Sequence, residues 1–163
     1  MPIKRRKDRS NLKGTLVLKS TEKPHYYNVY LWNDVRSMYE NVYTQEAGRT
    51  YDEIGTDNEI LGFCVFNTYL YDPEKRLPNP SPLLGEIHFI AGRWDELVVA
   101  HELQHAILHR MRVLRPLARE VMKQVKSKVW YGNAEEDICH EYGRWFSKLY
   151  RWLWEIDAHG KHA

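Results

Sequence analysis

The chain has 163 residues, of which 43% are hydrophobic and 28% charged, and its formal net charge is +2. This length suits one domain with a hydrophobic core, and the composition excludes a disordered or fibrous chain. No apolar stretch approaches the ~18 residues typical of a membrane span. No apolar segment of the kind found in signal peptides follows the N-terminal basic run, so we expect no signal peptide. The two cysteines, Cys64 and Cys139, form no CxxC pair. We therefore expect a cytoplasmic protein with no membrane contact and no disulfide framework.

A basic run, KRRKDR, occupies Lys4–Arg9 near the N-terminus. Short runs of like charge at a chain end are usually solvated, so residues 1–10 are predicted to form a disordered tail. Residues 11–163 are predicted to form a single domain. A nucleic-acid contact by the basic run is the alternative, which one short run does not distinguish from a tail.

The N-terminal half is predicted to be mainly β-structure. Alternating, aromatic and β-branched residues predict strands in three segments: Thr15–Ser20, Ile60–Tyr71 and Leu83–Gly92. The second half of Val29–Tyr43 is predicted to be helical.

The rest of the chain is predicted to be helical, beginning with a helix that Asp95 caps. Trp94 is placed to pack onto Val99 as a hydrophobic staple across this cap. Pro116 is expected to end or kink the helix near Arg115, because a proline removes a backbone donor and restricts the residue before it.

Two further helices are predicted after this proline. Leu117–Trp130 carries apolar residues at a spacing of four, and Tyr131–Asn133 is expected to break it. The last helix is expected from about Ala134 to Ile156, with Glu141 on its polar face. Strands followed by helices predict an α+β fold, in which a small N-terminal sheet packs on the C-terminal helices.

The stretch AHELQHAILH, residues 100–109, places three histidines four residues apart, with a glutamate beside the first. On a helix, His101 and His105 lie on one face, so two imidazoles can bind one metal ion from the same side. Glu102 lies about 100° around the helix, at the edge of that face. From there its carboxylate can reach a water on the metal without displacing a ligand. HExxH on a helix therefore predicts a Zn²⁺ site with Glu102 as the catalytic general base.

The alternative is that this five-residue pattern arose by chance in an exposed helix. The motif lies between the apolar runs LVVA and AIL, however, which predicts a buried helix. Two histidines and a glutamate in a buried helix need polar partners, and a metal ion supplies them. Such a site also needs a third protein ligand and one position left for water.

The segment Asn133–Gly143 is the expected source of the third ligand, since it offers several carboxylates and a histidine on a helix that must pack on the core. Glu136 is favoured there. Cys139 and Gly143 follow it at i+3 and i+7, and such small residues let two helices approach closely, as a shared metal requires.

Other interpretations of this segment stay open. Asn133 and Glu136 match the Asn-x-x-Glu pattern of a helix capping box. Glu135 is the rival ligand, but it falls nearer the middle of the apolar face, where an unpaired carboxylate is costly. His140 is the next candidate.

Two other histidines and an oxyanion donor need interpretation. His109 lies about 80° around the helix from His101, so we expect a core or supporting residue rather than a ligand. His88, on the strand before the helix, either lines the cleft or is an ordinary strand histidine. Hydrolysis needs a donor for the developing oxyanion. The candidates are Tyr131, Tyr142, His140 and His109.

Three segments resemble known zincin-like proteins. HELQHAILH resembles the HELGHxxLH helix of the ImmA/IrrE-type metallopeptidases of phages and mobile elements. The E-x-x-C of Glu136–Cys139 looks like the E-x-x-A third-ligand helix of that group. YGNAEEDICHE is similar to the YAxEELVAE segment of ArdC-type antirestriction proteins, another zincin-like group. The similarity covers about Leu83 to Trp145.

This resemblance implies a zincin-like fold with a gluzincin-like site. His101, His105 and Glu136 would be the zinc ligands and Glu102 the base. The resemblance also implies an edge strand beside the cleft, here GEIHF at Gly85–Phe89.

The sequence thus predicts a zinc-dependent metallopeptidase that hydrolyses a protein or peptide. The alternative is a zincin-fold module that binds protein or nucleic acid, as an antirestriction or defence-related inhibitor does, with a structural or vestigial metal site. Glu102 favours the enzyme, because a structural site has no role for a base. The sequence leaves the substrate and the oligomeric state open.

Overall fold

The structure, a computed structural model, describes residues 9–43, 61–66, 82–124 and 129–158. These residues form a four-stranded mixed sheet and three helices, which confirms the α+β prediction. The elements are β1 (Leu12–Lys19), β2 (Tyr26–Trp32), α1 (Val35–Met38), a π-helical turn η1 (Tyr39–Tyr43), β3 (Gly62–Phe66), β4 (Leu83–Ile90), α4 (Glu96–Gln124) and α5 (Val129–Ile156). Of the predicted N-terminal tail, only Arg9 and Ser10 belong to the described residues.

The sheet has the strand order β1-β2-β4-β3. β1 pairs antiparallel with β2, β2 pairs parallel with β4, and β4 pairs antiparallel with β3. The expectation that Gly85–Phe89 forms the edge strand is therefore wrong, because this segment lies inside β4 between two partners. Every residue from Leu84 to Ile90 is buried, as in strands covered on both faces. Within the described residues, the edge strand beside β4 is β3.

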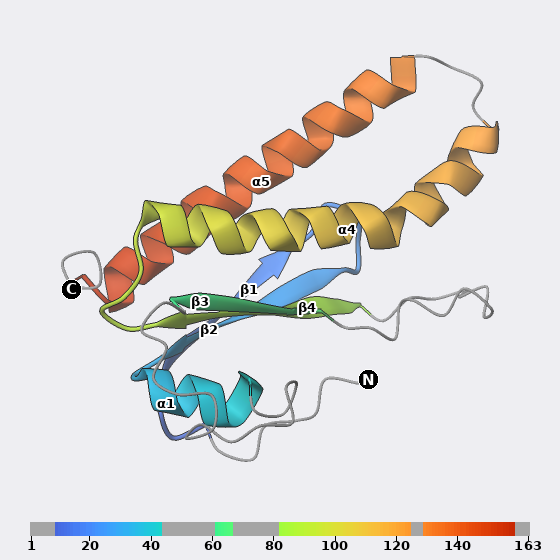
Figure 1. Cartoon of the computed structure of the whole chain (residues 1–163). Helices are drawn as coiled ribbons and strands as arrows, with labels where there is room; N and C mark the ends of the chain where they lie inside the picture. The colour runs from blue at the N-terminus through green and yellow to red at the C-terminus, as the bar shows by residue number, and fades with distance from the viewer. Residues whose placement is uncertain (1–8, 44–60, 67–81, 125–128, 159–163) are drawn as a thin grey trace.

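The two long helices cover one face of this sheet, and α1 lies against the other (Figure 1). Two hydrophobic clusters follow from this arrangement. The larger one lies under the long helices and includes Ile87, Phe89, Leu103 and Trp145. The smaller one lies on the α1 side and includes Trp32, Met38, Tyr39 and Ile90. Residues 87 and 89 of β4 thus face the long helices, and residues 88 and 90 face α1.

The start of α4 is as predicted. The Asp95 carboxylate accepts a hydrogen bond from the backbone N–H of Val98 at 2.8 Å, which satisfies one of the free donors of the first turn. Trp94 and Val99 are both fully or almost fully buried in the larger cluster, as a hydrophobic staple requires. The N-cap prediction is confirmed.

The ends of the long helices differ from the sequence prediction. α4 continues past Pro116 to Gln124, and Figure 1 shows it bending in its C-terminal part, so there is no separate helix after the proline. α5 already begins at Val129 and runs through Tyr131–Asn133, so the predicted break there is wrong. A glycine costs a helix interior only ~1 kcal/mol relative to alanine, which does not end a long packed helix.

This start of α5 also decides the interpretation of Asn133. The residue lies inside the helix rather than at its N-cap, so the capping-box alternative is wrong. Among the described residues, no helix is long and apolar enough to cross a membrane.

Candidate functional site

The histidine pair lies on α4, one helical turn apart. The Nε2 atoms of His101 and His105 are 3.1 Å apart, and both side chains are exposed. Two nitrogens bound to one tetrahedral Zn²⁺ at 2.0–2.1 Å lie about 3.3 Å from each other. Partial burial, and secondly the neighbouring His101, lower the pKa of His105, which favours the neutral imidazole that binds metal. The spacing and the donor type of this pair therefore fit two ligands of a zinc ion.

Glu102 lies against strand β3. Its side chain is buried, and burial raises its pKa to about 7. The side chain of Glu102 can occupy this position because residue 62 is a glycine. A Cβ atom on residue 62 would lie 2.7 Å from Cγ of Glu102. The carboxyl group can therefore gain or lose a proton near neutral pH, as a general base must.

A pocket of about 630 Å³ lies between β3 and α4 and joins these groups. The described residues that line it are Leu61, Gly62, Phe63, Cys64, Phe66, Leu97, Val98, His101, Glu102 and His105. Burial, and secondly the Glu102 carboxylate, raise the pKa of the Cys64 thiol well above its usual value. The thiol is thus protonated and a poor nucleophile at neutral pH.

The structure does not bring the predicted third ligand to this pocket. Glu136 is exposed on α5, where its carboxylate lies 3.6 Å from Nε2 of His140. The side chain of Glu135 lies outside the described residues. Within the part of the chain that is described, no group of three or more His, Cys, Asp or Glu side chains could hold a metal ion. The assignment of Glu136, or of its rivals Glu135 and His140, stays a prediction.

His109 is a core residue, as expected. Its Nδ1 lies 2.8 Å from the hydroxyl of Tyr27, which in turn donates a hydrogen bond to the carbonyl of Ala106 at 2.9 Å. Because the hydroxyl has one proton to give, Nδ1 of His109 is the donor to it. The His109 ring stacks on Phe66 with centroids 4.2 Å apart. His109 thus packs against Phe66, which lines the pocket.

His88 is the ordinary strand histidine of the two alternatives. It is fully buried and faces the α1 side of the sheet, away from α4. Its Nδ1 accepts a hydrogen bond from Nε1 of Trp32 at 3.1 Å, and its Nε2 lies 3.4 Å from a carboxylate oxygen of Glu86. The ring also stacks on Tyr30, with centroids 5.2 Å apart. These contacts give His88 a structural role.

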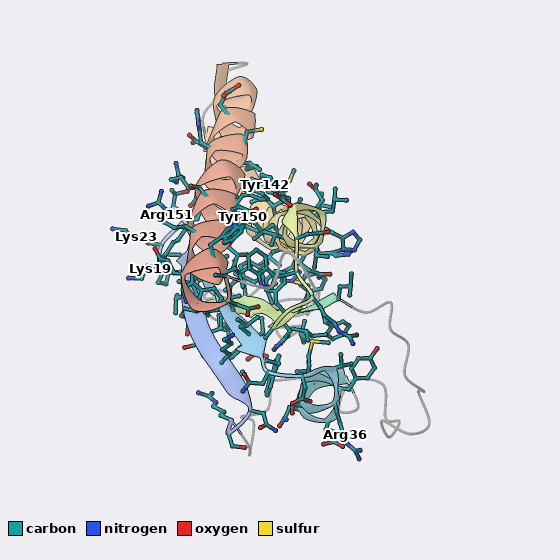
Figure 2. The ribbon with its side chains drawn as sticks, turned by 90° about the vertical axis from the view of Figure 1, so that its left-hand side faces the viewer. Lys19, Lys23, Arg36, Tyr142, Tyr150 and Arg151 are labelled. Atoms are coloured by element: carbon teal, nitrogen blue, oxygen red, sulfur yellow. The ribbon has the colours of Figure 1, made fainter. Side chains whose placement is uncertain are left out.

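Tyr142 is the oxyanion candidate that contacts α4. Its hydroxyl donates to the carbonyl of Ala100, the residue before His101, at 3.3 Å, and partial burial raises its pKa. Figure 2 shows Tyr142 and Tyr150 where α5 crosses α4, and the Tyr150 hydroxyl donates to Glu96 at 2.7 Å. The side chain of Tyr131 lies outside the described residues.

A buried ion pair that the sequence analysis missed connects the two long helices. Nη2 of Arg110 lies 2.8 Å from Oε2 of Glu141, and both side chains are almost fully buried. Thr21, in the turn between β1 and β2, donates to Glu141 from its backbone N–H and its hydroxyl. The prediction that Glu141 lies on a polar face is wrong. Its spacing from Ile138 and Trp145, which also face the core, was the signal available in the sequence.

No family model, no curated protein and no solved structure matches this chain.

Proposed function

We propose that the protein is a zinc-dependent peptidase in which His101 and His105 bind the metal and Glu102 is the general base. One observation carries this proposal. The histidine pair and a buried glutamate with a pKa of about 7 line the same pocket, beside strand β3. Carboxyl groups shifted to near neutrality in a cleft are typical of acid–base catalysis.

Each residue has a distinct task in this proposal. His101 and His105 hold the ion through Nε2. When bound, zinc supplies the Lewis acidity that lowers the pKa of water toward ~7 and polarises a carbonyl group. Glu102 accepts the proton of the attacking water and returns it to the leaving amine. Gly62 leaves the space that the Glu102 side chain needs to reach its position.

Strand β3 suits a peptide substrate. Among the described residues it is the outer strand of the sheet, paired with β4, and it forms one side of the pocket. An extended peptide can add to such an edge through backbone hydrogen bonds, which hold it without regard to its side chains. This supports a peptide rather than a small metabolite as the substrate.

The second candidate is a zincin-like module that binds a protein or nucleic acid and keeps only a vestige of the metal site. It is favoured by the lack of a third metal ligand beside the histidine pair in the described residues. The position of Glu102 argues against it, because burying a carboxyl group costs stability and a binding module without a reaction would gain nothing from that cost.

The metal is tested first. Protein purified without chelator is expected to contain one zinc per chain by elemental analysis, and His101→Ala or His105→Ala is expected to lose most of it. The control is Gln104→Ala, an exposed residue between the two histidines. Stoichiometric zinc in the His101→Ala/His105→Ala double variant would contradict the assignment. The same assay on Glu136→Gln and Glu135→Gln identifies the third ligand.

The reaction is tested with Glu102→Gln. This variant is expected to keep its zinc and its fold but to lose proton transfer, which is worth about 10²–10⁴ in rate. Wild type and variant are expressed in the same cells, and new protein N-termini are compared across the proteome. Glu155→Gln, an exposed change on α5, is the control. New termini that persist in Glu102→Gln would exclude Glu102 as the base.

A further inference from the structure

The pocket beside the histidine pair is lined mostly by apolar side chains. Its α4 wall contains Leu97 and Val98, and Leu61 and Phe66 line the side formed by β3 and the residue before it. Its polar lining consists of the HExxH side chains and the protonated Cys64 thiol. No Lys, Arg or Asp among the described residues lines it. An acidic substrate side chain would therefore lose hydration without a cationic partner, and a basic one would have only Glu102, the proposed base, as an acidic partner among these residues. An apolar side chain would gain free energy on burial.

The β3 wall of this pocket is fixed before any ligand binds. Phe66 stacks on His109, and His109 is held by the hydrogen bond to Tyr27. Tyr27 is itself fully buried and bound to the carbonyl of Ala106 on α4. A pocket whose walls are already ordered gives up little conformational entropy when it is filled.

Leu97 is the exposed part of the α4 wall. Its side chain is 79% exposed, although it belongs to a pocket-lining helix face that continues to His101 one turn later. Leu97 forms one apolar surface with the other apolar side chains of the pocket, and a contiguous exposed apolar surface is typical of a binding site.

We propose that this pocket is a subsite for a large apolar side chain, such as Phe, Leu or Met, next to the bond that is cleaved. The inference rests on the proposed function, since it names the class of peptide that the same site accepts. The volume of about 630 Å³ is within the range of ~300–1,000 Å³ that ligand pockets occupy. The apolar lining selects the side chain, and strand β3 holds the peptide backbone.

The test measures binding separately from cleavage. Glu102→Gln protein supplied with zinc is immobilised and equilibrated with a pool of synthetic nonapeptides. These contain glycine and alanine except at the central position, which takes each common residue in turn. Retained peptides are quantified by mass spectrometry. Peptides with central Phe, Leu or Met are expected to be retained about ten- to a hundredfold better than those with Ser, Asp or Lys.

A matched pair of leucine variants locates the binding site. In the Glu102→Gln background, Leu97→Ser is expected to reduce the apolar preference at least threefold, because it removes part of the pocket wall. Leu108→Ser changes a leucine of the same helix that is 40% exposed and does not line the pocket, so it is expected to leave the preference unchanged. Both variants are checked for an unchanged melting temperature. Equal effects of the two changes, or no apolar preference at all, overturn the proposal.

Wild-type protein is incubated with the same peptide pool to separate the two proposals. Apolar peptides that are retained but not cleaved support the subsite and overturn the peptidase. Cleavage that requires Glu102 but shows no preference for an apolar residue supports the peptidase and overturns the subsite. A protein that neither prefers nor cleaves any peptide overturns both.

Discussion

Gly62 and Glu102 depend on each other across the gap between β3 and α4. A Cβ atom at residue 62 would lie 2.7 Å from Cγ of Glu102, closer than real Cβ contacts come, and 3.1 Å from its Oε1. In Gly62→Ala the carboxyl group must therefore move. Because a shift of about 1 Å in a catalytic group can cost a hundredfold in rate, we expect turnover to fall at least tenfold while zinc is retained. Activity and zinc content measured on the same sample check this.

Gly143→Ala is the matched control for this change. A Cβ atom at residue 143 would meet nothing within 4 Å, and the residue is exposed on α5. Alanine there is expected to keep full activity and to stabilise the helix by roughly 0.5–1 kcal/mol. If Gly62→Ala is as active as Gly143→Ala, the position of Glu102 against β3 is not needed for turnover.

The residues of this site differ in how far the sequence could predict them. The relation of His101, Glu102 and His105 is local, since helical periodicity alone brings them to one part of α4. Gly62 comes from a strand about 40 residues earlier, and no periodicity indicates which helix it faces. The role of His109 behind Phe66 depends in the same way on contacts across elements.

The buried ion pair between α4 and α5 allows a test at the scale of whole elements. Removing one partner leaves the other charge buried without compensation, which typically costs 3–5 kcal/mol. Glu141→Ala is therefore expected to lower the free energy of unfolding by about 3–5 kcal/mol. Urea denaturation measures this, with Glu40→Ala as a control, because the Arg36–Glu40 pair is exposed on α1–η1 and such pairs contribute ~1 kcal/mol or less.

A double variant separates charge from packing at this position. Arg110→Met/Glu141→Leu removes both charges and keeps most of the volume, so it is expected to recover most of the stability lost in Glu141→Ala. If the double variant is as unstable as the single one, the hydrogen bonds to Ser20 and Thr21 matter more than the ion pair.

The elements themselves could be predicted in type but not in extent. The cap at Asp95 follows from a local hydrogen bond that the sequence indicates directly. Pro116 and Gly132 are local signals too, yet both lie inside helices. Each costs only a few kcal/mol at most, and in a long helix tertiary packing outweighs such a cost.

The order of strands and helices predicts the α+β class of the whole molecule, but not the arrangement of its sheet. β2 pairs in parallel with β4, about 50 residues further on, and β3 is added outside β4. Several of the strands are apolar, so their own residues do not indicate which one lies at the edge of the sheet. Packing on both faces of the sheet decides this. The pocket lies beside this edge strand, so the position of the candidate site depends on a feature that only the fold reveals.

Asp157 holds together distant parts of the molecule. It follows the end of α5 and accepts hydrogen bonds from Nζ of Lys13 in β1, from the backbone N–H of Gly92 and from Nε1 of Trp94. Burial alone would raise the pKa of Asp157, but these hydrogen bonds and the charge of Lys13 outweigh it, so the pKa lies below its usual value. The fold therefore favours the ionised carboxylate.

This preference predicts how stability changes with pH. A carboxyl group whose pKa is lower in the folded than in the unfolded chain stabilises the protein fully above the unfolded pKa of ~3.9. The contribution is lost as the pH falls toward the folded pKa. Asp157→Asn is expected to lower the free energy of unfolding at neutral pH by about 1.5–3 kcal/mol, the range for hydrogen bonds to a charged group.

The difference between wild type and Asp157→Asn is then expected to shrink between about pH 5 and pH 3, because wild type alone loses this contribution there. Urea denaturation followed by tryptophan fluorescence across that range measures it. Other carboxyl groups titrate in both proteins and cancel in the difference. If the difference in the free energy of unfolding stayed constant with pH, Asp157 would stabilise the fold through its shape and through neutral hydrogen bonds. Its charge would then not help to connect β1, the start of α4 and the end of α5.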